Sequence, residues 1–291
     1  MPGKIGVLIY TYNRTDDAKI NMEIIRNEWA RLDRFKDCVI VHSFNGEPEW
    51  HPEPYLEDSL VRSENSWHFQ GASDLIDFGF EEFKKQYHDV SHIVVLAADT
   101  WMVRPEYVEG IIHEMEHGQF VLSSCPWGIG EHNNPEKIGI AADFFVVDFQ
   151  WARESSFFPI KYSQFFEKYG ELLLYRNAGN IMLEKLVYTR YLQALSRQEN
   201  MPGFPKRVSR ERFLSMKERM PIHSEILDKG DWRRTMYWPE IGLLTHHDPY
   251  EKKLILRTLD IRGGESLERL LGSDDLGYYN RGVTKDRNSS N

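Results

Sequence analysis

The stretch from Ser91 to Pro105, SHIVVLAADTWMVRP, is the part of the chain that decides its expected fold. Four apolar residues, Ile93 to Leu96, lead through two alanines to a lone acid, Asp99. A short apolar run of this kind predicts a β-strand buried on both faces of a sheet. Ligands of open α/β sheets bind just beyond the carboxyl ends of such strands. Asp99 is therefore placed to face a ligand or a metal ion, unless it only caps the turn that follows.

Strands and helices alternate on the amino-terminal side of this stretch. Apolar, β-branched runs predict strands at Lys4–Thr11, Asp37–His42 and Leu60–Arg62. Helical spacing predicts helices at Ala18–Leu32 and Gly71–Gln86, the second with Leu75, Phe83 and either Phe78 or Gly79 facing inward. This alternation predicts an α/β fold with a mainly parallel central sheet flanked by helices.

The pattern changes after Pro105. We expect helices at Tyr107–His117, Ser163–Tyr169, Ile181–Leu195 and Arg207–Met220, strands at Gln119–Ser124 and Ala141–Phe149, and loops at Pro126–Lys137 and Pro202–Lys206. Residues 1–271 are interpreted as one domain with two halves, 1–105 and 106–271. Residues 272–291 are polar and without periodicity, which is typical of a mobile tail.

Composition narrows the classes of function. The chain has 291 residues, a formal net charge of -9 and 28% charged residues, with no long basic run. This charge argues against a nucleic-acid partner. No segment approaches the roughly 20 apolar residues of a membrane span. With only two cysteines and an amino end unlike a signal peptide, we expect a cytoplasmic protein.

Four segments in chain order carry a resemblance to a known family. They are YTYNR at 10–14, SFNG at 43–46, ENSWHFQGASDLIDFGF at 64–80 and VVLAADT at 94–100. Together they resemble nucleotide-sugar glycosyltransferases of the GT-A fold, similar to glycosyltransferase family 2. The resemblance covers the first 105 residues well and is looser beyond Val121. It implies transfer of a sugar from a nucleoside diphosphate, with UDP the most frequent nucleotide in that family, to a glycan or small hydroxyl acceptor.

The resemblance also implies which residues hold the donor. The loop after the first strand and the turn after the second would contact the nucleotide, and the segment before the second helix would contact the nucleoside. The corresponding residues here are Tyr10, Thr11, Tyr12, Arg14, Asn45, Asn65, Gly71 and Asp74.

The family's Asp-x-Asp motif binds a divalent metal, and the matching tripeptide here is Ala97-Ala98-Asp99. The first acid is missing. A hard cation such as Mn²⁺ or Mg²⁺ needs only one or two carboxylates beside the donor phosphates. In the family a histidine near the carboxyl end completes the site. The candidates here are His246 and His247, of which we favour His247. If the metal has been lost, Arg14 and Arg104 are the candidates to replace its charge.

An inverting transferase also needs a general base for the acceptor hydroxyl. By resemblance Glu184, in the segment NAGNIMLEK at 177–185, is the first candidate. Asp143 and Asp148 are rivals that point to opposite faces of one strand, so at most one of them faces the cleft. A retaining enzyme would need no such base, and Glu184 would then only support its helix.

The motifs of competing activities are either absent or poorly placed. Neither G-x-x-x-x-G-K nor a dinucleotide-type G-x-G-x-x-G follows the first strand. HEMEH at 113–117 formally satisfies H-E-x-x-H, but we expect it on an outward face of its helix, where it would not form a protease site. Because Ala97 removes one acid of the metal motif, the alternative function is a catalytically inactive protein of this fold that binds a nucleotide or glycan.

Overall fold

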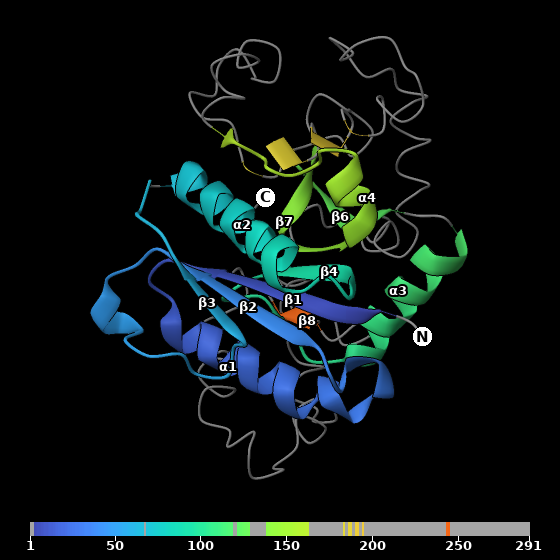
Figure 1. Ribbon diagram of the computed structural model, residues 1–291, viewed down its shortest axis with the longest axis horizontal. Coiled ribbons are helices and arrows are strands. Elements are labelled where there is room, and N and C mark those ends of the chain that lie inside the picture. Colours follow the sequence, from blue (N-terminus) through green and yellow to red (C-terminus); the bar gives the residue numbers. More distant parts are fainter. Residues whose placement is uncertain are drawn as a thin grey trace, which may run out of the picture.

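A computed structural model of the chain describes residues 3–66, 68–118, 121–128 and 138–162, with positions 183, 186, 187, 190, 191, 194, 243 and 244. Its centre is a six-stranded sheet in the order β3-β2-β1-β4-β7-β6 (Figure 1). The parallel strands are β1 (Lys4–Thr11), β2 (Val39–Phe44), β3 (Ser59–Arg62) and β4 (Val90–Ala97). This arrangement confirms the predicted α/β class with a mainly parallel central sheet.

Two further strands extend the sheet with the opposite pairing. β7 (Ile138–Asp148) runs antiparallel to β4, and β6 (Leu122–Gly128) runs antiparallel to β7. A separate two-stranded ribbon pairs β5 (Trp101–Met102) with β8 (Leu243–Leu244). The ribbon brings the stretch just after Asp99 against residues more than 140 positions later in the chain.

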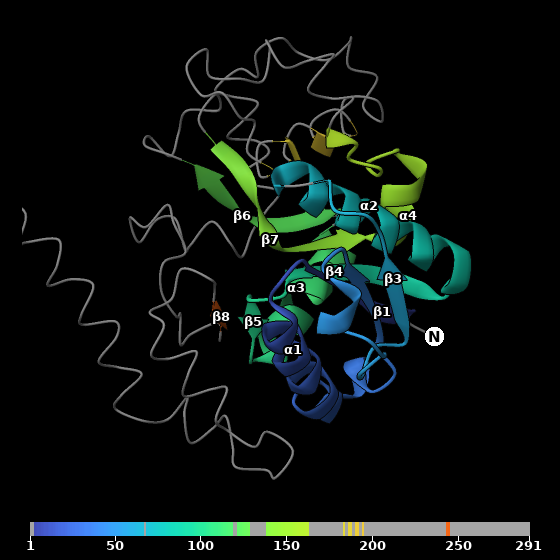
Figure 2. The same ribbon diagram turned by 90° about the vertical axis from the view of Figure 1, so that its left-hand side faces the viewer.

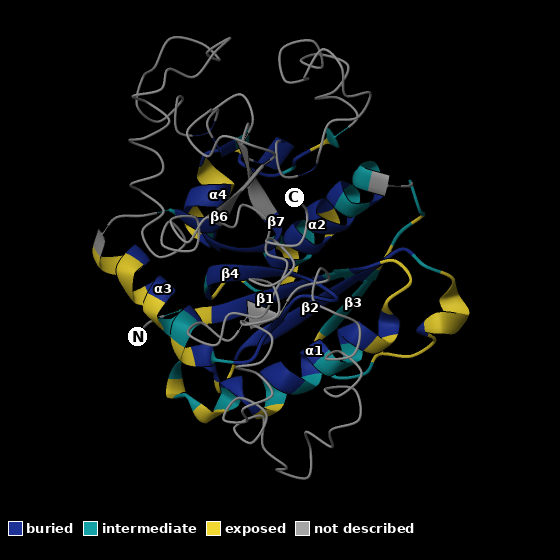
Figure 3. Ribbon diagram, turned by 180° about the vertical axis from the view of Figure 1, so that it is seen from behind, coloured by how far each residue is buried: buried dark blue, intermediate teal, exposed yellow. Residues whose placement is uncertain are grey.

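Helices cover both faces of the sheet, so the fold has three layers (Figure 2). α1 (Thr15–Asn27) and α3 (Pro105–Gly118) pack on one face, and α2 (His68–Gln86) and α4 (Phe149–Glu154) pack on the other. Short 3-10 helices occupy Trp29–Arg31 (η1), Asp33–Phe35 (η2) and Pro48–Trp50 (η3). Alternate residues of β1 and β4 point into the two apolar cores, which explains why both strands read as continuous apolar runs (Figure 3).

The register of the strands brings three carboxyl ends to one level. Tyr10 of β1 pairs with Ser43 of β2 on one side and with Ala97 of β4 on the other. The residues that follow these positions therefore emerge side by side at one edge of the sheet. Every loop that the sequence marked as a donor contact starts from this edge or from the adjacent end of α2.

Several element boundaries differ from those predicted. α1 starts at Thr15 and ends at Asn27, where η1 takes over, and the second strand is displaced to Val39–Phe44. β6 continues through Pro126-Trp127-Gly128, which we had predicted as a loop, after an irregularity in pairing between Ser124 and Pro126. A proline disfavours a central strand but is tolerated at an edge or bulge, and β6 is the edge strand. The helices predicted at Ser163–Tyr169 and Arg207–Met220 lie outside the described residues.

Among the described helices, none is both long enough and apolar enough to cross a lipid bilayer.

Candidate functional site

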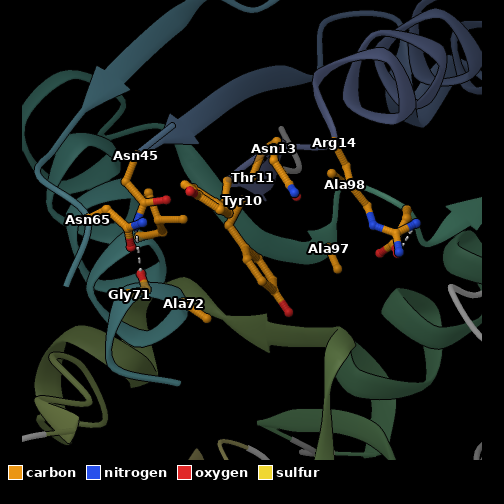
Figure 4. A pocket seen from close by; sticks show the side chains of 13 residues that line it. Tyr10, Thr11, Asn13, Arg14, Asn45, Asn65, Gly71, Ala72, Ala97 and Ala98 are labelled. Carbon is orange, nitrogen blue, oxygen red and sulfur yellow. Dashed lines mark hydrogen bonds and ion pairs between the residues drawn. The ribbon is translucent and has the colours of Figure 1, made fainter. Parts of the chain in front are cut away.

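A pocket of about 240 Å³ lies at the edge where β1, β2 and β4 end. Figure 4 shows its lining side chains arranged in a row, with Asn45, Asn65 and Gly71 at one end and Arg14 at the other. Tyr10 and Thr11 lie between the two ends. The residues that line it are Tyr10, Thr11, Tyr12, Asn13, Arg14, Asn45, Asn65, Gly71, Ala72, Leu75, Ala97, Ala98 and Asp99. Its position at the carboxyl ends of parallel strands is the one where α/β sheets bind ligands.

The amide end of the pocket presents hydrogen-bonding groups. Asn45 is buried, and its side-chain Nδ2 donates to the carbonyl of Gly71 at 3.4 Å, while its backbone N–H donates to the Thr11 carbonyl at 3.2 Å. The Asn45 Oδ1 and Thr11 Oγ1 atoms are buried without a hydrogen-bond partner in the structure. Because buried polar atoms are normally paired, these two are well suited to a polar ligand.

Gly71 permits the close packing at this end. A Cβ atom at position 71 would lie 3.1 Å from both the Asn45 Nδ2 and the Asn65 Oδ1 atoms. This distance is tight, so a larger residue would push against both amides. Gly71 therefore keeps the first turn of α2 near the two asparagines.

The charged end of the pocket contains one acid among the described lining residues, Asp99. Its carboxylate is largely buried and lies 3.1 Å from the guanidinium of Arg14, which also lies 3.5 Å from Asp17. The Arg14 side chain is half exposed, whereas both acids are buried. Arg14 thus bridges two acids at the mouth of the site and keeps one side open to solvent.

Among the described lining residues, one carboxylate is available to a divalent cation at this end. Asp99 supplies one carboxylate, which is the minimum that Mg²⁺ uses beside phosphate oxygens and water. The second proposed ligand, His247, lies outside the described residues. Arg14 is shared between two carboxylates, Asp17 and Asp99, so this cluster carries a formal charge of -1 and a bound cation would favour an anionic ligand here.

Asp143 lies beside the same end of β4. The antiparallel ladder pairs Leu96 with Phe144, so the next step along it places Asp143 next to Ala97, a lining residue. Asp143 is buried, and its Oδ2 accepts a hydrogen bond from the Thr100 hydroxyl at 3.4 Å. The Tyr10 hydroxyl donates to the neighbouring Ala142 carbonyl at 3.3 Å, which joins β7 to the pocket.

An aromatic pair stands at the rim of the site. Tyr12 and Trp50 meet edge to face with ring centroids 5.8 Å apart, and both remain partly exposed, at 36% and 41%. Trp50 belongs to the segment between β2 and β3. The position of this segment therefore affects one wall of the entrance.

The structure brings together seven of the eight residues predicted to contact the donor, together with Asp99. The eighth, Asp74, is half-buried on α2 and is not among the lining residues. Glu184 lies outside the described residues, as does His247. Asp148 has a different role from the one considered, because its side chain caps α4 by accepting the Trp151 N–H at 2.7 Å.

The HEMEH segment lies on α3, as expected from its position after the β4 strand. His113 and His117 are exposed, and their rings stack with centroids 4.0 Å apart. The His117 Nδ1 contacts the His113 carbonyl at 2.7 Å. Among the described residues neither histidine belongs to a group of three possible metal ligands.

Sequence reasoning missed the apolar part of the site. Ala72 and Leu75 form part of the wall of the pocket, and Ala97 and Ala98 contribute small side chains beside Asp99. The two alanines were noted only as a departure from a motif. Their small size was the available signal, since it leaves room for a ligand at the end of β4.

Comparison with known proteins gives a limited result. No family model matches the chain, and no curated protein matches it. The solved structures that match the chain include two of low similarity. A CMP:2-keto-3-deoxy-manno-octonic acid synthetase complexed with CTP has 10% identity and a TM-score of 0.36, over 67% of this chain and 86% of that one. The glycosyltransferase GlyE of Streptococcus pneumoniae TIGR4 has 11% identity and a TM-score of 0.45, over 90% of this chain and 62% of that one.

Proposed function

We propose that the protein is a glycosyltransferase that takes a sugar from a nucleoside diphosphate donor and passes it to a hydroxyl acceptor. The observation that carries the proposal is one pocket with two chemically distinct ends. The Asn45 amide, whose buried Oδ1 has no hydrogen-bond partner, lies at one end with Asn65, and the Arg14–Asp99 pair lies at the other. A nucleoside diphosphate has the same division, with a polar base at one end and two phosphates at the other.

The amide end suits the nucleoside. Side-chain amides offer both donors and acceptors, so Asn45 and Asn65 have the groups needed to pair with the edge of a base. The volume of about 240 Å³ is below the ~300–1,000 Å³ typical of ligand pockets. We therefore infer that the nucleoside occupies the pocket and that the sugar extends beyond its charged end. UDP is the favoured nucleotide on the family resemblance.

The charged end suits the diphosphate. Loss of the glycosyl group leaves negative charge on the phosphates, and a fixed positive group stabilises that charge in the transition state. Arg14 has donors for this task if its half-exposed side chain turns from the two acids toward the phosphates. A divalent ion held by Asp99, and in our proposal by His247, would supply the same stabilisation when bound.

The acceptor side of the reaction is proposed to lie toward β7. Asp143 lies on β7 opposite Ala97, the last residue of β4. The hydrogen bond that it accepts from the Thr100 hydroxyl orients its carboxylate. An oriented carboxylate next to the sugar could accept the proton of the acceptor hydroxyl. Glu184 remains the other candidate for this role.

The first test is a thermal-denaturation panel with UDP, GDP, CDP and dTDP, each with Mn²⁺ or with EDTA. A ligand at about 100 times its dissociation constant adds about 2.7 kcal/mol of stability to the folded state. We expect one nucleotide to raise the midpoint and Arg14→Gln to reduce that rise. The matched control is Arg31→Gln. The Arg31 side chain is equally exposed and forms an ion pair with Glu28, with an N–O distance of 2.9 Å, and neither residue lines the pocket.

The outcomes separate the alternatives. A shift that needs Mn²⁺ and disappears in Asp99→Ala supports the metal-assisted reaction, whereas a shift that survives EDTA assigns the charge to Arg14 alone. Release of the nucleoside diphosphate from the matching nucleotide sugar then distinguishes a transferase from an inactive binding protein. The absence of a shift with every nucleotide would overturn the proposal.

A further inference from the structure

A second polar cluster joins β2 to the segment between β2 and β3, and none of its residues lines the pocket. His42 belongs to β2, His51 follows η3, and Glu57 precedes β3. One potential ligand atom from each residue lies within 4.8 Å of the other two. All three side chains have 0–1% of their surface exposed.

We propose that His42, His51 and Glu57 form a binding site for a divalent transition metal, with zinc the preferred ion. Two imidazoles and one carboxylate are a ligand set that zinc uses, with water or another group in the fourth position. This proposal is independent of the proposed glycosyl transfer. It concerns residues that do not line the pocket.

The unusual state of His42 is the main argument. Both of its ring nitrogens are buried without a hydrogen-bond partner, and so is the His51 Nδ1 atom. Leaving a buried polar group without a partner destabilises the folded state. A metal bound to an imidazole nitrogen would remove part of that cost, which hydrophobic packing around the ring cannot do.

Two of the three separations between the ligand atoms are close to those of a metal site, and the third, between the two imidazole nitrogens, is at most 4.8 Å. The Glu57 Oε1 atom lies 2.8 Å from the His51 Nε2 atom and 3.5 Å from the His42 Nδ1 atom. Bonds of ~2.0–2.2 Å in tetrahedral geometry place ligand atoms about 3.3 Å apart. The first contact would lengthen by roughly half an ångström, and the second is already close to this separation.

The carboxylate is held in the orientation that a metal site requires. The other oxygen of Glu57, Oε2, accepts the backbone N–H groups of Tyr55 at 2.8 Å and Leu56 at 3.0 Å. These bonds turn Oε1 toward the two rings. Such supporting contacts commonly fix the ligands of metal sites.

The site would fix the segment that carries Trp50. His51 directly follows Trp50, and Trp50 contacts Tyr12 at the rim of the pocket. Arg62 reinforces the same segment by donating to the His51 carbonyl and, at 3.1 Å, to the Pro52 carbonyl. A metal here would thus order one wall of the pocket entrance without contacting the donor.

The test measures zinc bound to the full chain by elemental analysis. The protein is stripped with a chelator, dialysed and equilibrated with micromolar zinc. We expect one tightly bound zinc per chain, and at least about tenfold weaker binding in His51→Gln and Glu57→Gln. The matched control is His92→Gln, because His92 is the comparable buried histidine in β4 and lies outside the cluster.

Two more controls address competing sites. Asp99→Asn should keep its zinc, which distinguishes this cluster from the proposed donor metal. A double variant, His113→Ala with His117→Ala, should also keep it, because these exposed residues lie on α3. X-ray absorption spectroscopy of the zinc-loaded double variant should show two imidazole ligands. This measurement leaves the residues of the cluster unaltered.

The proposal is overturned by either of two results. The stripped protein could fail to take up zinc at micromolar concentration, or the zinc could remain in both His51→Gln and Glu57→Gln. If those variants do not fold, the X-ray absorption spectrum decides the question, since fewer than two imidazoles would contradict the site.

Discussion

At the scale of single residues, Asp77 shows how burial sets the charge of a group. It lies in α2, and its two oxygens accept the backbone N–H groups of Ile160 at 2.5 Å and Lys161 at 2.9 Å. Burial raises its pKa to about 7, although the two N–H groups act to lower it. The folded protein therefore keeps the Asp77 proton to a higher pH than the unfolded chain does.

This difference predicts a pH dependence of stability. The unfolded chain loses the Asp77 proton near its ordinary pKa of 3.8, and the folded chain loses it near 7. The stabilising contribution is thus complete below pH 4 and falls as pH rises to about 7, by up to about 1.4 kcal/mol per unit. Denaturant unfolding of the wild type and of Asp77→Asn at several pH values measures it. A difference between them that does not change from pH 4 to 7 would contradict the assignment, and Asp16→Asn, at an exposed acid, is the control.

At the scale of elements, the contact of α2 with the sheet depends on Gly79. A Cβ atom at position 79 would lie 1.9 Å from the Leu8 Cδ1 atom and 2.7 Å from the Ser43 Oγ atom. Phe78, the neighbouring residue, is instead 46% exposed. The structure therefore answers the question that helical spacing left open, because Gly79 and not Phe78 faces the sheet.

Two glycine substitutions test this packing. Gly79→Ala should destabilise the protein by about 1–3 kcal/mol, because overpacking outweighs the gain in helix propensity. Gly110→Ala on α3 is the matched control, since nothing lies within 4 Å of the added Cβ. It should be neutral or stabilise by up to about 1 kcal/mol. Urea denaturation compares the two, and equal effects would show that α2 does not pack as closely as the structure indicates.

At the scale of the whole molecule, the pocket joins loops from three strands and one helix. A nucleotide that binds there should reduce backbone hydrogen exchange at residues 10–14, 45–46, 71–75 and 97–100 together. The exposed side of α3 (Figure 3) should change little, because it faces away from the site. Hydrogen-exchange mass spectrometry with the nucleoside diphosphate that gives the largest thermal shift measures this pattern, with Arg14→Gln as the control. Protection confined to α3 or spread evenly over the chain would place the ligand elsewhere.

Local signals located most elements but not all of their ends. The first strand was predicted at Lys4–Thr11 and is found there, because its apolar run has sharp polar borders. The helix predicted from Gly71 begins at His68, because residues 68–70 add too few positions to show a helical period. β6 passes through Pro126 because its pairing with β7 outweighs the local turn preference.

By itself, the sequence determined the order of strands and helices, and with it the α/β class, because hydrophobic periodicity is a property of neighbouring residues. It also marked Asp99 and the loop after the first strand as candidates for a site. Only the tertiary structure decided that Arg14 contacts Asp99, and that His42, His51 and Glu57 surround one point. Those contacts depend on strand register, on side-chain direction and on the path of the segment between β2 and β3. None of these can be read from the spacing of residues along the chain.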